Sequence, residues 1–157
     1  MLAENDLRML EKMVTVGERT NTGRLGDFER RRMAGLPNAT VTRDQIDRVG
    51  PITLSRMLRG MSGLQIRDSL GNAVAVSTRG AKPIRAGSSI GFGLVPCVMR
   101  MSVDGVLLPA TANIDAIVPK DVHGIEVYFG PARMPPELAG LRTDNWCGLI
   151  AIWTRDR

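Results

Sequence analysis

The fold is decided between residues 54 and 68, where the chain reads LSRMLRGMSGLQIRD. Before Gly63, apolar residues recur at the spacing that forms one stripe along a helix. These residues are Leu54, Met57, Leu58 and Met61. After Gly63 the apolar residues alternate with polar ones, as in a strand with one buried face. The stretch therefore predicts a helix over residues 53–61 that leads directly into a strand, which is the pattern of an α+β domain.

A second short helix is predicted just before this stretch. Thr42 is followed three residues later by Gln45, which is the spacing of a capping box at a helix N-terminus. This helix should end near Val49, because the residue before Pro51 disfavours helical geometry.

Downstream of Gly63 the chain alternates repeatedly and predicts about five strands. The six segments from which this set of about five strands is predicted are 64–68, 73–79, 99–103, 106–108, 125–129 and 149–153. Asp104-Gly105 predicts a tight hairpin, and Pro119 to His123 predicts one helical turn closed by Gly124. The predicted fold is thus α+β, with a small mixed sheet of about five strands and two short N-terminal helices. The helix over 53–61 is expected to cover one face of the sheet.

Residues 1–35 are predicted to be an N-terminal arm and linker, and residues 36–157 the folded domain. Leu7, Leu10 and Val14 have helical spacing, although residues 14–16 favour a strand. Residues 17–35 contain four glycines and the run Arg30-Arg31-Arg32, which we interpret as a solvated basic linker.

Composition narrows the classes of function without selecting one. The 157 residues are 43% apolar but only 4% aromatic, so an aliphatic core is expected. The net charge of +5 and pI of about 10.0 would suit nucleic acid, anionic lipid or an acidic protein wall. No apolar run is long enough for a transmembrane helix. The opening residues MLAEND lack the features of a signal peptide, which predicts a cytoplasmic protein if this start is genuine.

The sequence offers no convincing catalytic, cofactor or metal site. Residues 87–91 read GSSIG and match the nucleophile motif G-x-S-x-G, but the residues that follow do not favour the helix this motif requires. His123 is the sole histidine, and we interpret it as a surface group at a helix end. One His and two distant Cys do not supply a zinc site. We therefore expect no enzyme activity, no cofactor and no metal.

Six segments, in order, resemble the plug domain of TonB-dependent outer-membrane receptors. They are Val41–Ile46, Leu54–Leu64, Val76 to Arg79-Gly80, Val103-Asp104-Gly105-Val106, Ile125-Glu126-Val127 to Gly130-Pro131, and Cys147–Arg155. The cysteine pair and the ending Ile152-Trp153-Thr154-Arg155 are similar to one subgroup, in which a carboxypeptidase-regulatory-like domain precedes the plug. Residues 134–138 depart from the family, which has a Tyr-Gly turn at that place.

The resemblance implies a non-enzymatic domain that fills the lumen of a receptor barrel and helps to bind and gate an incoming ligand. It implies a place at the periplasmic face of the outer membrane. It also implies contact with TonB, for which the β-favouring segment Met13-Val14-Thr15-Val16 is the candidate. A barrel of this class needs more residues than the chain has. We therefore expect a fragment or a stand-alone relative, whose ligand is unknown. The alternative is a basic module that binds nucleic acid or an anionic surface, although the chain lacks the expected aromatic platforms.

The resemblance also bears on two pairs of residues. In the family, the arginine of the Arg-Gly strand end faces acidic groups, and Glu126 is the candidate partner of Arg79 within this chain. Cys97 and Cys147 each begin a predicted strand, so they permit either a disulfide or two buried thiols. The resemblance to exported receptors favours the disulfide.

Overall fold

The computed structural model describes residues 23–79, 82–86, 89–93, 97–140 and 145–156. The predictions for residues 1–22, among them the helical spacing of Leu7, Leu10 and Val14 and the TonB contact over Met13–Val16, lie outside these ranges. The helices are α2 (Gly23–Met33), α3 (Arg43–Val49), α4 (Leu54–Leu58) and α5 (Pro136–Ala139), with short 3-10 helices η1 (Ile114–Ala116), η2 (Pro119–Asp121), η3 (Pro131–Arg133) and η4 (Asn145–Cys147). The strands are β1 (Ala39–Val41), β2 (Leu64–Ser69), β3 (Asn72–Ser77), β4 (Lys82–Ala86), β5 (Ser89–Gly93), β6 (Cys97–Val98), β7 (Arg100–Val103), β8 (Val106–Leu107), β9 (Val122–Tyr128) and β10 (Leu149–Thr154).

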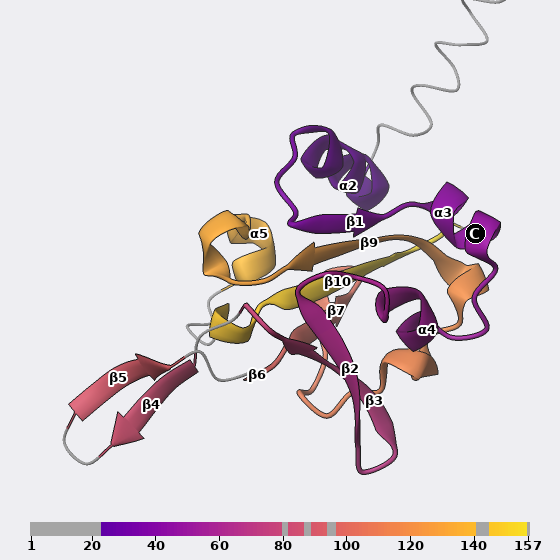
Figure 1. Cartoon of the computed structure of the whole chain (residues 1–157). Coiled ribbons are helices and arrows are strands. Elements are labelled where there is room, and N and C mark those ends of the chain that lie inside the picture. Colours follow the sequence, from indigo (N-terminus) through magenta and orange to yellow (C-terminus); the bar gives the residue numbers. More distant parts are fainter. Residues whose placement is uncertain (1–22, 80–81, 87–88, 94–96, 141–144, 157) are drawn as a thin grey trace, which may run out of the picture.

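The described strands form three sheets, and the largest of them is the main layer of the domain (Figure 1). The main sheet has five strands in the order β1-β9-β10-β7-β8, and β10 and β7 run parallel while the other neighbours are antiparallel. A three-stranded sheet, β2-β3-β6, and the hairpin β4–β5 complete the set. The α+β class with a mixed five-stranded sheet is confirmed, and the two predicted short helices are α3 and α4.

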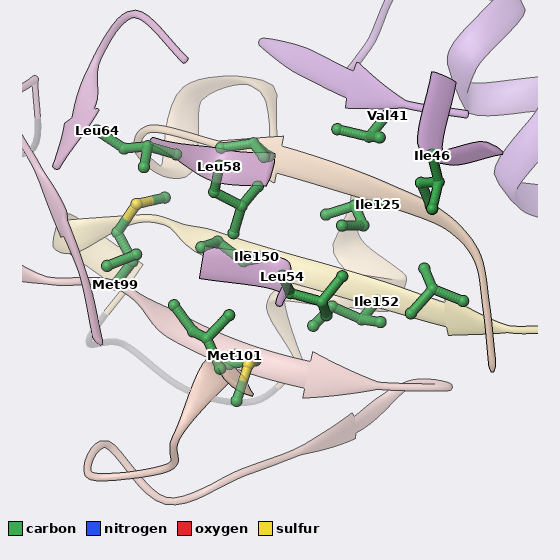
Figure 2. Packing of buried hydrophobic residues seen from close by; sticks show 14 of the residues in the cluster. Val41, Ile46, Leu54, Leu58, Leu64, Met99, Met101, Ile125, Ile150 and Ile152 are labelled. Carbon is green, nitrogen blue, oxygen red and sulfur yellow. The ribbon is translucent and has the colours of Figure 1, made fainter. Parts of the chain in front are cut away.

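The main core lies on one face of the five-stranded sheet, under α3, α4 and the β2–β3 hairpin. Leu54 and Leu58 of α4 are fully buried against Ile150 and Ile152 of β10 (Figure 2). Burying one such aliphatic side chain contributes about 1.5–3 kcal/mol. The helical stripe predicted over 53–61 thus covers the sheet as expected, although the helix is shorter and ends at Leu58.

The predicted capping box is present at the start of α3. The side chain of Thr42 accepts from the amide of Gln45, and the Gln45 side chain accepts from the amide of Thr42 at 2.8 Å. Gly50 closes the helix in the left-handed conformation, just before Pro51. The sequence therefore predicts both ends of α3 correctly.

The linker predicted over residues 17–35 is wrong in its described part. Residues Gly23–Met33 form helix α2, which covers the opposite face of the main sheet. Phe28 is fully buried on β9, and a Cβ atom at Gly124 would stand only 2.3 Å from its ring. Glycine at position 124 is what allows the helix to approach the strand so closely. The boundary between residues 35 and 36 stays a prediction.

Residues 82–86 and 89–93, for which the sequence predicted no strand, form a hairpin. Strands β4 and β5 pair from Lys82↔Gly93 to Ala86↔Ser89, and the hairpin extends away from the two larger sheets (Figure 1).

The Asp104-Gly105 hairpin is present between β7 and β8. Both residues have positive φ angles, 49° and 84°, as a tight two-residue turn requires. The Asp104 carboxylate accepts from the Thr154 amide at 2.9 Å, from the Thr154 hydroxyl at 2.6 Å and from Nε of Arg24 at 3.0 Å. Asp104 thus joins the turn to the end of β10 and to the start of α2.

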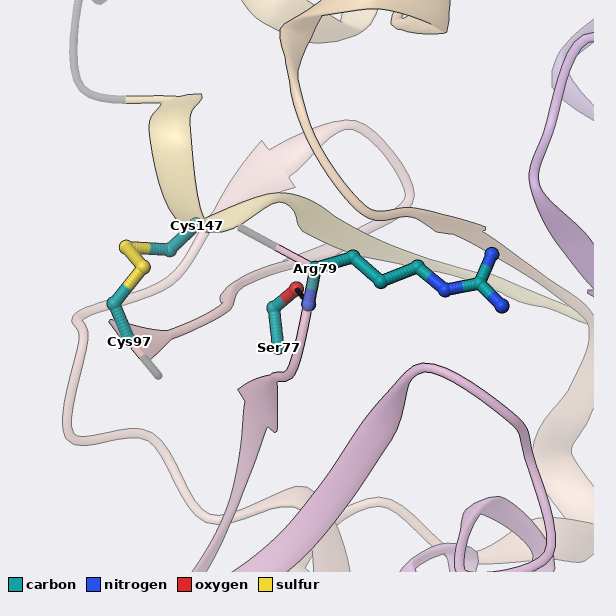
Figure 3. Close-up of a disulfide and its surroundings, with 4 residues drawn as sticks. All are labelled: Ser77, Arg79, Cys97 and Cys147. Carbon is teal, nitrogen blue, oxygen red and sulfur yellow. Dashed lines mark hydrogen bonds between the residues drawn. A yellow bond between two sulfur atoms is a disulfide. The ribbon is translucent and has the colours of Figure 1, made fainter. Parts of the chain in front are cut away.

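Cys97 and Cys147 form a disulfide, with their Cα atoms 5.3 Å apart (Figure 3). Cys97 begins β6, which pairs with β3, whereas Cys147 ends η4 just before β10. The bond therefore links the three-stranded sheet to the five-stranded sheet.

Removing this disulfide should lower the stability of the domain. The bond closes a sequence separation of 50 residues, which corresponds to about 4 kcal/mol in the chain-entropy treatment. We expect the double variant Cys97→Ser/Cys147→Ser to lose up to about this amount in urea-induced unfolding. An unchanged unfolding midpoint and slope would contradict this expectation.

Asp104 should make the stability depend on pH in the acidic range. Burial acts to raise the pKa of Asp104, but the hydrogen bonds from Thr154 and the guanidinium of Arg24 outweigh it and lower the pKa below its usual value. The folded state therefore favours the charged form. The resulting stabilisation is present at neutral pH and is lost as the pH falls through the lowered folded value.

The variant Asp104→Asn keeps the positive φ angle, which asparagine tolerates. It should be less stable than the parent at pH 7, and the difference should shrink once the pH falls below about 4. Thermal unfolding across this range checks the prediction, and a difference independent of pH would contradict it.

Candidate functional site

The most distinctive cluster of polar side chains lies beneath α2, on the face of the main sheet opposite the main core. Glu126 points into this face from the centre of β9, where it is opposite Thr40 of β1 and Ala151 of β10. Its side chain is fully buried, and that of Arg31 on α2 is 6% exposed. The run Arg30-Arg31-Arg32 is therefore not a solvated linker, because its central member is in the interior.

Glu126 is bound by three different side chains. Arg31 donates from Nε to Oε1 at 2.8 Å and from Nη2 to Oε2 at 3.0 Å, which is the two-pronged geometry of the strongest arginine–carboxylate pairs. Trp153 donates from Nε1 at 2.7 Å, and the Tyr128 hydroxyl donates at 3.1 Å. The guanidinium of Arg31 also lies over the Trp153 ring, 5.2 Å from its centre. Every acceptor atom of the carboxylate is thus engaged.

The surroundings fix the protonation of the groups around Glu126. Burial, followed by the negative charge of Glu126, raises the pKa of Tyr128 well above its usual value, so its hydroxyl remains a donor. Burial alone would lower the pKa of Arg31, but the hydrogen bonds and charge of Glu126 outweigh it and raise the pKa. The cluster therefore favours the charged form of Arg31 and the neutral form of Tyr128.

The predicted pairing of Arg79 with Glu126 is wrong. Arg79 follows the end of β3, where its amide donates to Oγ of Ser77 at 3.2 Å (Figure 3). Its exposed guanidinium donates to Ser62 Oγ at 3.4 Å and lies 5.2 Å from the centre of the Phe129 ring. Glu126 faces the other side of the main sheet and belongs to Arg31.

The sequence indicates that His123 lies at a helix end, but the structure places it elsewhere. The predicted helical turn is η2 and ends at Asp121, so His123 lies in β9. There it packs edge-on against the Phe28 ring and approaches Oε1 of Glu29 to 3.6 Å. Both contacts are made to α2, so His123 helps to hold this helix on the sheet.

The remaining candidates have structural placements. Ser89 of the GSSIG motif begins strand β5, which is not the strand-to-helix turn a nucleophile elbow requires. Ile125 and Val127 point into the main core, and Gly130-Pro131 begins η3. Gly80 lies outside the described residues. Across the described ranges, no three His, Cys, Asp or Glu side chains are grouped so as to hold a metal ion, and no helix there is long and apolar enough to cross a bilayer.

Fold and cluster together define a small α+β domain whose interior polar side chains tie its layers to one another. The chain matches the family described as TonB-dependent Receptor Plug Domain over residues 31–135, well over half of its length, and it belongs to this family. Among solved structures, the chain is similar to the ferric yersiniabactin uptake receptor FyuA from Yersinia pestis, with 21% sequence identity and a TM-score of 0.49. That similarity covers 75% of this chain and 17% of the receptor chain. No curated protein matched the chain.

Breaking the buried pair should destabilise the domain strongly. Arg31→Ala leaves the Glu126 carboxylate buried without its cation, which typically costs about 3–5 kcal/mol. Arg30→Ala is a matched control on the same helix, because Arg30 is largely exposed beside Asp27, and it should change stability little. Urea unfolding of the two variants gives the comparison.

The double variant Arg31→Met/Glu126→Leu should recover part of the loss, because neither charge then remains buried alone. The recovery should be incomplete, since Trp153 and Tyr128 lose the acceptor of their hydrogen bonds. Equal stability of the Arg31→Ala and Arg30→Ala variants would contradict the assigned role of the pair.

Proposed function

We propose that this chain is the plug of a β-barrel receptor of the outer membrane, at the periplasmic face, where it occupies the lumen and gates the uptake of a ligand. The observation that carries the proposal is the family match over residues 31–135. The layout of the domain supports it. A plug must stay folded while it is confined in a pore, and here the disulfide and the Arg31–Glu126 pair hold three layers together.

The β4–β5 hairpin is the part of the domain best suited to reach an incoming ligand. Its strands, residues 82–86 and 89–93, lie apart from the two larger sheets (Figure 1). A ligand-contacting element has to project from a rigid support, and the two larger sheets supply one. The ligand itself, a contact with TonB through Met13–Val16, and the subgroup with a preceding regulatory-like domain stay predictions.

The gating proposal can be tested by electrical recording. A receptor barrel of this family from which its own plug has been deleted should conduct ions across a planar bilayer. Adding this chain to the periplasmic side should lower the conductance, because the domain fills the lumen. An unrelated domain of equal size and net charge is the control. Unchanged conductance in a panel of plug-deleted barrels would count against the proposal.

The proposal also holds that the chain performs no chemistry, as expected for a transport module. Ser89 is the residue to test, since it alone satisfies the nucleophile motif. A chromogenic acyl ester should be hydrolysed no faster by the parent chain than by Ser89→Ala. Turnover that disappears in the variant would refute this part of the proposal.

A further inference from the structure

A groove of about 480 Å³ lies between β1, α3 and α4, on the side of the domain away from α2. It is lined by aliphatic and sulfur-containing side chains with two arginines among them. The lining residues are Thr40, Val41, Gln45, Arg48, Val49, Arg56, Met57, Gly60 and Met61. Val49 is 61% exposed although it is apolar, so this face presents uncovered apolar surface.

The groove carries positive charge that the described part of the chain does not neutralise. Arg48 and Arg56 are both exposed, and neither lies within ion-pair distance of an acidic side chain in the described ranges. No acidic residue is among those that line the groove. The arginines of α2 differ, because Arg30, Arg31 and Arg32 each have a carboxylate partner. The positive groove is thus a local feature and does not simply follow from the net charge.

The chemistry of the lining fits a protein partner better than a nucleic acid. Arginine and methionine are enriched at protein interfaces, and the planar guanidinium can bind a carboxylate through two hydrogen bonds. The lining contains no aromatic side chain on which a base could stack. Methionine is flexible enough to accommodate an apolar side chain of varied shape.

The groove also runs beside the edge of the main sheet. Strand β1 is the outermost strand and pairs only with β9 in the described part of the chain, while its residues Thr40 and Val41 line the groove. An edge strand offers backbone groups to an extended segment, which can add alongside it while its side chains enter adjacent pockets.

We propose that the groove between β1, α3 and α4 binds an extended, carboxylate-bearing segment of a partner protein along the β1 edge. The carboxylates bind Arg48 and Arg56, and the apolar side chains of the segment lie on Met57 and Met61. The inference rests on the proposed function in one respect, namely that a plug works within a larger protein assembly. The binding itself is tested on this chain alone, so its failure leaves the conductance experiment unaffected.

The test uses fluorescence anisotropy with a fluorescein-labelled peptide of repeating Glu-Leu-Gly units. The parent chain should bind this peptide, and Arg48→Glu/Arg56→Glu should weaken binding at least about tenfold, which is about 1.4 kcal/mol. Arg30→Glu/Arg133→Glu is the matched control, since it changes the net charge equally at two exposed positions outside the groove. It should bind as the parent does. Thermal unfolding of each variant confirms that it is folded.

Two further probes separate the alternatives. A peptide of the same sequence with methylated backbone nitrogens should bind more weakly, because it cannot donate to the β1 edge. Equal binding would overturn the proposed strand addition. Tighter binding of single-stranded DNA or of phosphatidylglycerol vesicles, lost in the groove variant, would overturn the assignment to a protein. Absence of peptide binding, or equal loss in both arginine variants, would overturn the site itself.

Discussion

A carboxylate that is fully buried in a small domain needs a partner of opposite charge, because transfer of an isolated charge from water costs several kcal/mol. Glu126 occupies such a position at the centre of β9. The strand is buried on both faces, with Ile125 and Val127 toward the main core and Glu126 toward α2. The rest of the structure on that side follows from this requirement. Helix α2 delivers Arg31, β10 delivers Trp153 and β9 itself delivers Tyr128.

The charge pair also explains why a helix with few apolar residues is docked at all. Among the side chains of α2, only Phe28 is fully buried and apolar. The absence of a side chain at Gly124 leaves room for its ring. Arg31, one turn further along, binds Glu126. Arg24, one turn earlier, binds Asp104 at the β7–β8 turn. Three contacts one turn apart therefore fix the helix along the strand direction, and two of them are ionic.

Local pattern was enough to predict some elements and not others, for a physical reason. The α3 capping box and the Asp104-Gly105 turn depend on residues within a few positions of one another, so neighbouring residues are enough to predict them. Helix α2 begins at a glycine and contains a run of three arginines, which by local rules indicates a solvent-exposed segment. The residue that buries Arg31 is 95 positions away, so nothing near α2 reveals it. The sequence around Glu126 did contain one indication, because this glutamate stands between Ile125 and Val127. In a strand that is buried on both faces, such a carboxylate needs a cation opposite it.

The predicted pairing of Arg79 with Glu126 went wrong for a related reason. Both segments were correctly assigned as strands, but they belong to different sheets, and the alternation along β9 directs Glu126 away from the main core. Strand identity is a local property, whereas the face to which a side chain points is settled only when the sheets are assembled. The cysteine pair was predicted from the resemblance to exported receptors, and the two residues lie at the points where β6 and β10, strands of different sheets, begin or are about to begin.

The disulfide also limits how far the chain can be drawn out. The covalent loop from Cys97 to Cys147 contains β7, β8 and β9, which are three of the five strands of the main sheet. A force applied to the N-terminal end can extend the residues before Cys97, but the 50-residue separation inside the loop is bypassed by the sulfur bridge. At about 3.4 Å per residue this withholds roughly 170 Å of contour length from the extended chain. Under tension, β7, β8 and β9, with Glu126, thus remain within one short, cross-linked loop, and the extension comes from the residues that precede Cys97.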